Sequence, residues 1–103
     1  MLQVEKLSNE FIVSFKGAKR LNVLMAVQVK EQLMKFFELD AARVHLNLDG
    51  INFIDSAGFE MLRLVNAEAV KANGEFCLLN VNEDVQELID LLDLNKELVI
   101  SNK

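Results

Sequence analysis

Hydrophobic and polar residues alternate near the start of the chain, which is the pattern of β-strands with one buried face. Residues 2–7 and 11–15 both alternate in this way, and the polar segment 8–10 between them supplies turn residues. We therefore expect the chain to open with a β-hairpin, followed by a loop over Gly17 to Asn22. Further strand-like segments are residues 44–48, 76–81 and 97–101.

Apolar residues recur at helical spacing in three later segments, residues 25–38, 56–73 and 83–92. Asn22 or a residue shortly after it is expected to cap the first helix, and Asn82 the last. Gly74 stands where a left-handed residue would end the second helix. Because these helices alternate with strands, the pattern predicts an α/β fold with a small mixed, partly parallel β-sheet covered by helices.

The strand at residues 76–81 is almost continuously apolar, which favours a strand covered on both faces. Cys77 within it is expected to be a small buried residue. A chain of 103 residues is expected to form one domain over 1–103 with a single core.

Charge and cysteine content narrow the function further. The net charge is −5 and no basic cluster is present, which argues against nucleic acid or an anionic membrane as a partner. One cysteine excludes an internal disulfide, and the N-terminus does not resemble a secretion signal. No apolar run approaches the ~20 residues of a membrane span. We expect a cytoplasmic protein.

The turn that follows the strand at 44–48 carries the most informative residues. Asp55 and Ser56 are both good N-cap residues, and Ala57 and Gly58 keep bulk away from the first helical turn. A serine hydroxyl at the positive end of a helix can carry a phosphoryl group, because free backbone N–H groups point towards it. Ser56 is therefore either a plain capping serine or a phosphorylation site.

The segment Phe53-Ile54-Asp55-Ser56-Ala57-Gly58-Phe59 resembles the signature of STAS-domain proteins, the anti-sigma factor antagonists of bacterial partner-switching systems. That family has an Asp, a Ser or Thr that accepts phosphate, a small residue and a Gly, and residues 55–58 match this pattern one for one. The resemblance extends over nearly the whole chain. It implies that Ser56 is the phospho-acceptor, supported by Asp55, Ala57 and Gly58.

The resemblance also concerns the loop before the first helix. In the family this loop carries an acidic residue near the phospho-acceptor. When the helix that follows the loop is aligned with the family's, the neutral Asn22 falls at that position. Lys19 and Arg20 make this loop basic, so one of them could accept the phosphate of Ser56. A phosphoserine adds about −1.5 to −2 charge, which a helix N-terminus tolerates but a packed partner surface does not.

The implied function is that of a non-enzymatic partner-switching regulator without a cofactor. Its expected partners are a serine kinase or anti-sigma factor with a GHKL-type ATP-binding fold, which phosphorylates Ser56, and a PP2C-type phosphatase, which reverses this. The output would be release of a sigma factor or another response such as biofilm or exopolysaccharide control. We expect the contact surface to include Lys19, Arg20, Phe59, Glu60 and Arg63, with Phe59 or Met61 as an exposed apolar contact.

Two other functions are compatible with the sequence. One is a non-switching STAS subunit of a transport assembly, and the other is a small nucleotide- or lipid-binding module, although no glycine-rich phosphate loop is present. Triad catalysis by Ser56 is not expected, because the hydrolase elbow needs a Gly at position 54, where Ile54 stands. His45 points away from the predicted core side of its strand. One His and one Cys cannot build a usual metal cluster, and Asp49 with Asp55 would make at most a weak magnesium site.

Overall fold

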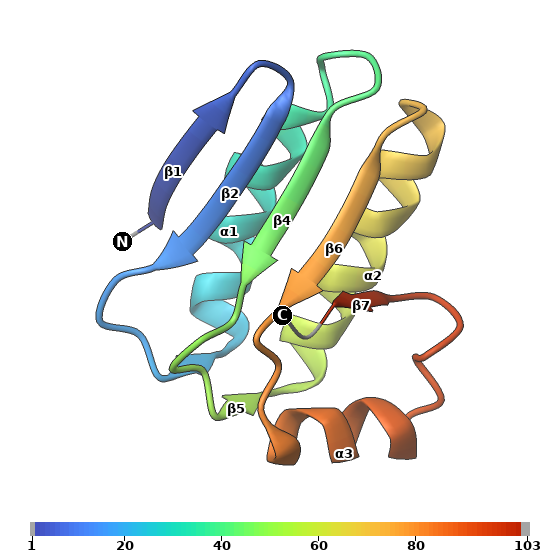
Figure 1. Cartoon of the computed structure of the whole chain (residues 1–103). Coiled ribbons are helices and arrows are strands. Elements are labelled where there is room, and N and C mark those ends of the chain that lie inside the picture. Colours follow the sequence, from blue (N-terminus) through green and yellow to red (C-terminus); the bar gives the residue numbers. More distant parts are fainter. Residues whose placement is uncertain (1, 102–103) are drawn as a thin grey trace.

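A mixed β-sheet forms the centre of the computed structural model, which describes residues 2–101 (Figure 1). In this range the sheet has five strands in the order β1-β2-β4-β6-β7, of which β1 and β2 pair antiparallel and the remaining neighbours pair parallel. The strands are β1 (Leu2–Leu7), β2 (Glu10–Phe15), β4 (Arg43–Asn47), β6 (Glu75–Leu79) and β7 (Val99–Ser101). The opening hairpin and the mixed, partly parallel sheet are thus confirmed.

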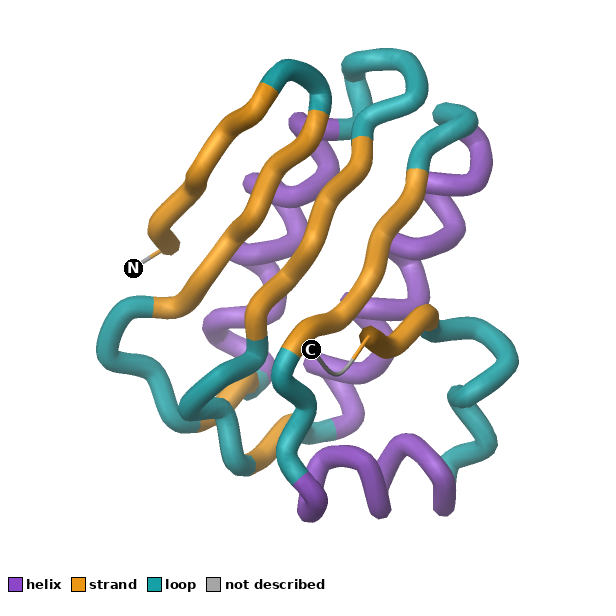
Figure 2. Tube along the Cα trace, viewed as in Figure 1, coloured by secondary structure: helices purple, strands orange, loops and turns teal. Residues whose placement is uncertain are grey.

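Helices α1 (Val23–Phe36) and α2 (Ser56–Lys71) pack side by side against one face of this sheet, and α3 (Glu83–Leu91) lies at its end (Figures 1 and 2). Each helix follows a parallel strand, so all three begin near the same edge of the sheet. Asn22 and Asn82 cap α1 and α3 as predicted, by accepting hydrogen bonds from the backbone N–H groups of Met25 and Val85.

A second, two-stranded sheet lies in segments that we had expected to be loop and turn. Strand β3 (Arg20–Leu21) pairs parallel with β5 (Phe53–Ile54), and the amide of Asn52 donates to the carbonyl of Lys19 at 2.9 Å. Two residues are too few for an alternating pattern to be recognised. The pairing matters for the site because it holds the loop before α1 against the turn before α2.

The prediction that residues 76–81 are covered on both faces is wrong. In β6, Phe76 and Leu78 are buried beneath the helices, whereas Glu75 is exposed and Cys77 and Leu79 are only half-buried. The corresponding residues of β4, including His45, are likewise exposed or half-buried on the side away from the helices. Apolar residues on both sides of a strand do not reveal which side another element will cover.

The end of α2 also differs from the expectation. The left-handed residue is Asn73 (φ 56°), not Gly74, and the amide of Gly74 donates to the carbonyl of Ala69 at 2.8 Å, which closes a Schellman motif. Gly74 is needed for another reason, since a Cβ there would lie 2.4 Å from the carbonyl oxygen of Ala42. Asparagine tolerates the left-handed conformation better than most residues, so it can take the position usually given to glycine.

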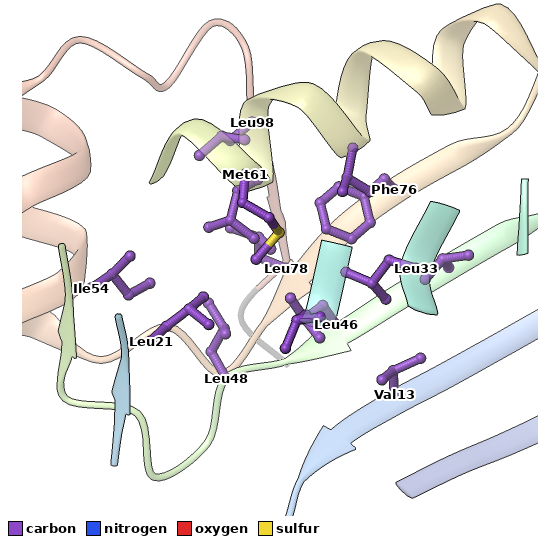
Figure 3. Packing of buried hydrophobic residues seen from close by; sticks show 14 of the residues in the cluster. Val13, Leu21, Leu33, Leu46, Leu48, Ile54, Met61, Phe76, Leu78 and Leu98 are labelled. Carbon is purple, nitrogen blue, oxygen red and sulfur yellow. The ribbon is translucent and has the colours of Figure 1, made fainter. Parts of the chain in front are cut away.

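The hydrophobic core lies between the sheet and helices α1 and α2 and continues to the edge where α2 begins (Figure 3). Val13, Leu46 and Leu78 project from neighbouring strands towards the helices (Figure 3). At the other end, Leu21 and Ile54 from the small sheet are fully buried beside Leu48 (Figure 3). The turn that carries Ser56 therefore stands on a packed, apolar base.

Candidate functional site

The turn between β5 and α2 is the candidate site, and Asp55 is the residue that caps the helix there. Asp55 has extended backbone angles, and its carboxylate oxygen Oδ1 accepts from the amide of Gly58 at 2.9 Å. Ser56 is the first residue of α2 and its side chain is exposed. Because Asp55 performs the capping, the interpretation of Ser56 as a plain N-cap serine is wrong.

The carboxylate of Asp55 also reaches the neighbouring helix. Its second oxygen, Oδ2, accepts from the amide of Val23, the first residue of α1, at 3.1 Å. One half-buried carboxylate thus satisfies an otherwise unpaired N–H group at the start of each of two helices. Asp55 therefore ties α1 to α2 beside the hydroxyl of Ser56, a role for which the sequence offered no signal beyond a capping residue.

Gly58 allows the first turn of α2 to press against the small sheet. A Cβ at this position would lie 2.6 Å from Cγ2 of Ile54 and 2.7 Å from the backbone oxygen of Leu21. The same oxygen accepts from the amide of Asp55 at 3.2 Å. The glycine of the Asp-Ser-Ala-Gly segment is thus required by close packing, and Ala57 before it is only half-buried.

Asn22 lies at the start of α1, where its side chain accepts from the amide of Met25 at 3.2 Å. It immediately precedes Val23, whose amide binds Asp55, so the loop residue and the candidate site belong to one hydrogen-bonded unit. Lys19 and Arg20 lie further back on the exposed side of this loop. The guanidinium of Arg20 stacks over the ring of Phe53, 5.8 Å from its centroid.

The side chains along the start of α2 divide between the core and the surface. Phe59 is 5% exposed and Met61 is 3% exposed, so the expectation that either is an exposed apolar contact is wrong. Both fall on the stripe of α2 that faces the sheet, which also carries Leu62 and Val65. Glu60 and Arg63 lie at the surface and form an ion pair, in which Nε of Arg63 donates to Glu60 at 3.1 Å.

This ion pair sets the electrostatics of the helix surface beside Ser56. The hydrogen bonds from Arg63 hold the pKa of the Glu60 carboxyl below its ordinary value, and the same contact raises the pKa of Arg63. A shallow hollow of about 240 Å³ adjoins the pair. Its lining residues are Ser56, Phe59, Glu60, Arg63, Leu92 and Leu94. The structure thus places the serine hydroxyl in the same depression as an acidic and a basic side chain.

An apolar groove between α1 and α2 adjoins the site on its other side. Val23, Leu24 and Val27 on α1 are 56%, 78% and 56% exposed, and Leu64 on α2 is 38% exposed. Val23, Val27 and Leu64 line a hollow of about 180 Å³ that Ala57 and Glu60 also border. None of these exposed apolar residues was predicted to lie at the site. The available signal was that they are apolar yet lie off the buried stripe of their helix.

Elsewhere, the uncovered face of the sheet carries a chain of polar contacts. Nδ1 of His45 lies 3.0 Å from the sulfur of Cys77, and Nε2 lies 2.9 Å from a carboxylate oxygen of Glu10. Partial burial is the main reason why the pKa of the Cys77 thiol is raised, and the nearby Glu75 carboxylate is the second. These residues lie on the middle strands and are not joined to the Ser56 turn by any hydrogen bond found within residues 2–101.

Neither a metal cluster nor a membrane-spanning helix is found in the part of the chain that the structure describes. Among residues 2–101, no group of three or more His, Cys, Asp or Glu side chains could hold a metal ion. No helix in this range has the length and apolar character needed to cross a membrane. Asp49, considered above with Asp55, is exposed at a turn, where its amide donates to the side chain of Asn47.

The sequence profile of the STAS domain matches residues 1–103. An anti-sigma-factor antagonist (STAS) domain protein from Planctomyces limnophilus has the same fold, with a TM-score of 0.85 and 18% identity over 99% of this chain and 90% of that one. For an anti-sigma factor antagonist from Mycobacterium paratuberculosis the TM-score is 0.79 at 18% identity, over 97% and 83% of the two chains. The anti-sigma factor antagonist SpoIIAA of Bacillus, in its unphosphorylated form, gives 0.77 at 17% identity, over 98% and 88%. A search of curated proteins found no match.

Proposed function

This chain belongs to the STAS domain family, and we propose that it is a cytoplasmic, non-enzymatic partner-switching regulator controlled by phosphorylation of Ser56. The observation that carries this proposal is the exposed hydroxyl of Ser56 on the first residue of α2, free of the capping role that Asp55 fulfils. A kinase can reach this hydroxyl without unfolding the helix. The overall likeness to anti-sigma factor antagonists supports the assignment.

Phosphate at this position would change the surface more than the fold. The first-turn amides of α2 and the helix dipole favour a negative group on Ser56. A partner packed over the same surface would instead bury a group of about −1.5 to −2 charge beside the carboxylates of Asp55 and Glu60. Burial of this added charge beside two carboxylates is costly, so we infer that the phosphorylated form releases its partner.

We place the partner surface around Ser56, over Glu60 and Arg63, the loop residues Lys19 and Arg20, and the apolar groove between α1 and α2. The proposed partner is a serine kinase or anti-sigma factor with a GHKL-type ATP-binding fold, and a PP2C-type phosphatase would restore binding. The groove supplies the apolar contact that buried Phe59 cannot. Val23 and Val27, each 56% exposed, are the apolar side chains of this groove most available to a partner.

The first test is the state of the protein in its native cell. Intact-mass analysis before and after phosphatase treatment should show one removable phosphate, and a Ser56→Ala variant expressed in the same cell should lack it. A permanently bound subunit of a transport assembly, the alternative role for this fold, would carry no such phosphate. Absence of the phosphate under every growth condition tested would therefore reject the switch.

The second test is partner binding. A pull-down with Ser56→Ala should capture a partner that Ser56→Asp fails to capture, and the purified partner should bind Ser56→Asp more weakly. Ser8→Asp is the matched control, because Ser8 is an exposed serine in the β1–β2 turn, at the opposite edge of the sheet. Equal affinity of the partner for Ser56→Ala and Ser56→Asp would contradict the proposal.

A further inference from the structure

Ser56, Glu60 and Arg63 follow one another along a single stripe of α2. They are spaced by four and three residues, which makes them successive neighbours on a helix surface. All three border the hollow of about 240 Å³ that Leu92 and Leu94, from the end of α3 and the segment after it, close on the other side. A group attached to Ser56 would enter a depression that already contains a guanidinium.

Arg63 is in contact with a carboxylate that phosphorylation would disturb. Its Nε and Nη2 atoms both donate to the carboxylate of Glu60. Helical side chains lean towards the N-terminus of their helix, so the guanidinium of Arg63 is directed towards the turn that carries Ser56. Both side chains of the pair remain substantially exposed, at 42% for Arg63 and 52% for Glu60, so they are free to rearrange.

We propose that Arg63 binds the phosphate of phosphorylated Ser56 and gives up its ion pair with Glu60 to do so. This inference rests on the proposed function, because it assumes that Ser56 carries phosphate. A phosphoserine offers three acceptor oxygens and up to twice the charge of a carboxylate, and Arg recognises such groups through two parallel hydrogen bonds. Glu60, four residues from the new charge, would be repelled by it.

Glu60 has another cation within the same surface. Lys30 of α1 and Glu60 both line the groove between α1 and α2, and Arg63 does not. We infer that Glu60 turns towards Lys30 when Arg63 turns towards the phosphate. The exchange would leave Arg63 and Glu60 each with a partner of opposite charge.

The basic residues of the loop before α1 are the competing acceptors. Arg20 lies on β3, opposite Phe53 of β5, and its guanidinium is occupied by the ring of Phe53. Asp55, which separates this loop from Ser56, is itself a carboxylate held by the amides of Val23 and Gly58. The hollow that holds Ser56 includes Arg63 but neither Lys19 nor Arg20.

The exchange has a consequence for the switch. A guanidinium in contact with the phosphate favours the fully ionised form, whose second pKa otherwise lies at about 6. Arg63 would thus increase the fraction of dianionic phosphate at pH values near 6, and the dianion is the form with the greatest effect on a bound partner. The same contact would hold the phosphate in a defined orientation over α2.

The test uses the full chain with phosphoserine incorporated site-specifically at position 56, so that no kinase is needed. Titration of the phosphorus NMR signal should show that Arg63→Gln raises the second pKa of the phosphate by about 0.3 to 0.7 unit relative to the native sequence. Arg63→Lys should raise the second pKa of the phosphate by less. Lysine keeps the positive charge but cannot donate the two parallel hydrogen bonds of a guanidinium. Phosphorylation should also raise the pKa of the Glu60 carboxyl, which would lose Arg63 and gain a negative neighbour.

Two variants serve as controls. Arg43→Gln removes a comparably exposed arginine, paired with Glu75 at 2.9 Å on the uncovered face of the sheet, and should leave the phosphate unchanged. Arg20→Gln should do the same. An unchanged phosphate pKa in Arg63→Gln, or a larger shift in Arg20→Gln, would overturn the assignment of Arg63. Neither result would affect the proposed switch, which is judged by the affinity of the partner for Ser56→Ala and Ser56→Asp.

Discussion

Replacement of Gly58 by alanine should destabilise the domain, although the same change at most helical positions is stabilising. Alanine is favoured over glycine in a helix by about 0.8–1 kcal/mol. At position 58, however, the new Cβ would lie 2.6 Å from Cγ2 of Ile54 and 2.7 Å from the oxygen of Leu21. Overpacking of this kind costs about 1–3 kcal/mol.

The position of the Leu21 oxygen makes the higher part of that range the better expectation. This atom belongs to the backbone of β3 and accepts a hydrogen bond from the amide of Asp55, so it cannot move without disturbing the paired strands. Ile54 is 1% exposed and belongs to the hydrophobic core, so its side chain is held by its neighbours. After the helical gain is subtracted, we expect Gly58→Ala to lower the free energy of unfolding by about 1–2 kcal/mol.

Urea unfolding followed by circular dichroism measures this change, and the chain supplies a matched control in the same helix. Ala67 is exposed on α2, so Ala67→Gly should cost about 1 kcal/mol and calibrates the propensity difference in this context. A Gly58→Ala protein as stable as the native one, or more stable, would refute the reasoning. It would mean that α2 can move away from β3 without cost.

Three further predictions concern neighbouring features. Asp55→Ala should lower the free energy of unfolding by about 2 kcal/mol. Asp55→Asn should lower it by about half as much, because Asn keeps the acceptor for the amide of Gly58 and loses the acceptor for the amide of Val23. Equal losses for the two variants in urea unfolding would exclude the bridge between the helices. Phe59→Ala should lower the free energy of unfolding by about 3–5 kcal/mol, as expected for a buried aromatic residue. An unfolding midpoint close to the native value would show that Phe59 is not a core residue. The raised pKa of Cys77 means that the folded thiol stays protonated when the unfolded one ionises, so stability should fall as the pH rises above the ordinary thiol range. Cys77→Ala should lessen this alkaline loss, and identical pH profiles of the two proteins in urea unfolding would contradict the assignment.

Much of the fold was predictable because its signals are local. The hairpin follows from alternation on either side of a polar turn, and the helices follow from apolar residues at helical spacing. The caps at Asn22 and Asn82 were recognisable because a capping side chain bonds to an amide three residues ahead. Helix bounds nevertheless shifted by about two residues, since the ends depend on what packs against them.

The candidate site was predictable only in part. Four consecutive residues, Asp55 to Gly58, marked its place, and the strand before them and the helix after them placed it at the edge of the sheet. The assignment of the cap to Asp55, and not to Ser56, required the observed backbone, since both residues are good caps. That Ser56 accepts phosphate stays a prediction.

The sequence by itself determined which residues share a face of each strand or helix, because that depends only on the periodicity of the backbone. It also determined the Asp-Ser-Ala-Gly turn and hence the family. Only the tertiary structure decided that one side of the sheet stays uncovered, that Phe59 is buried, and that the carboxylate of Asp55 reaches the amide of Val23. Each of these depends on residues far apart in the chain being brought together, and no local pattern encodes which of several apolar faces another element will cover.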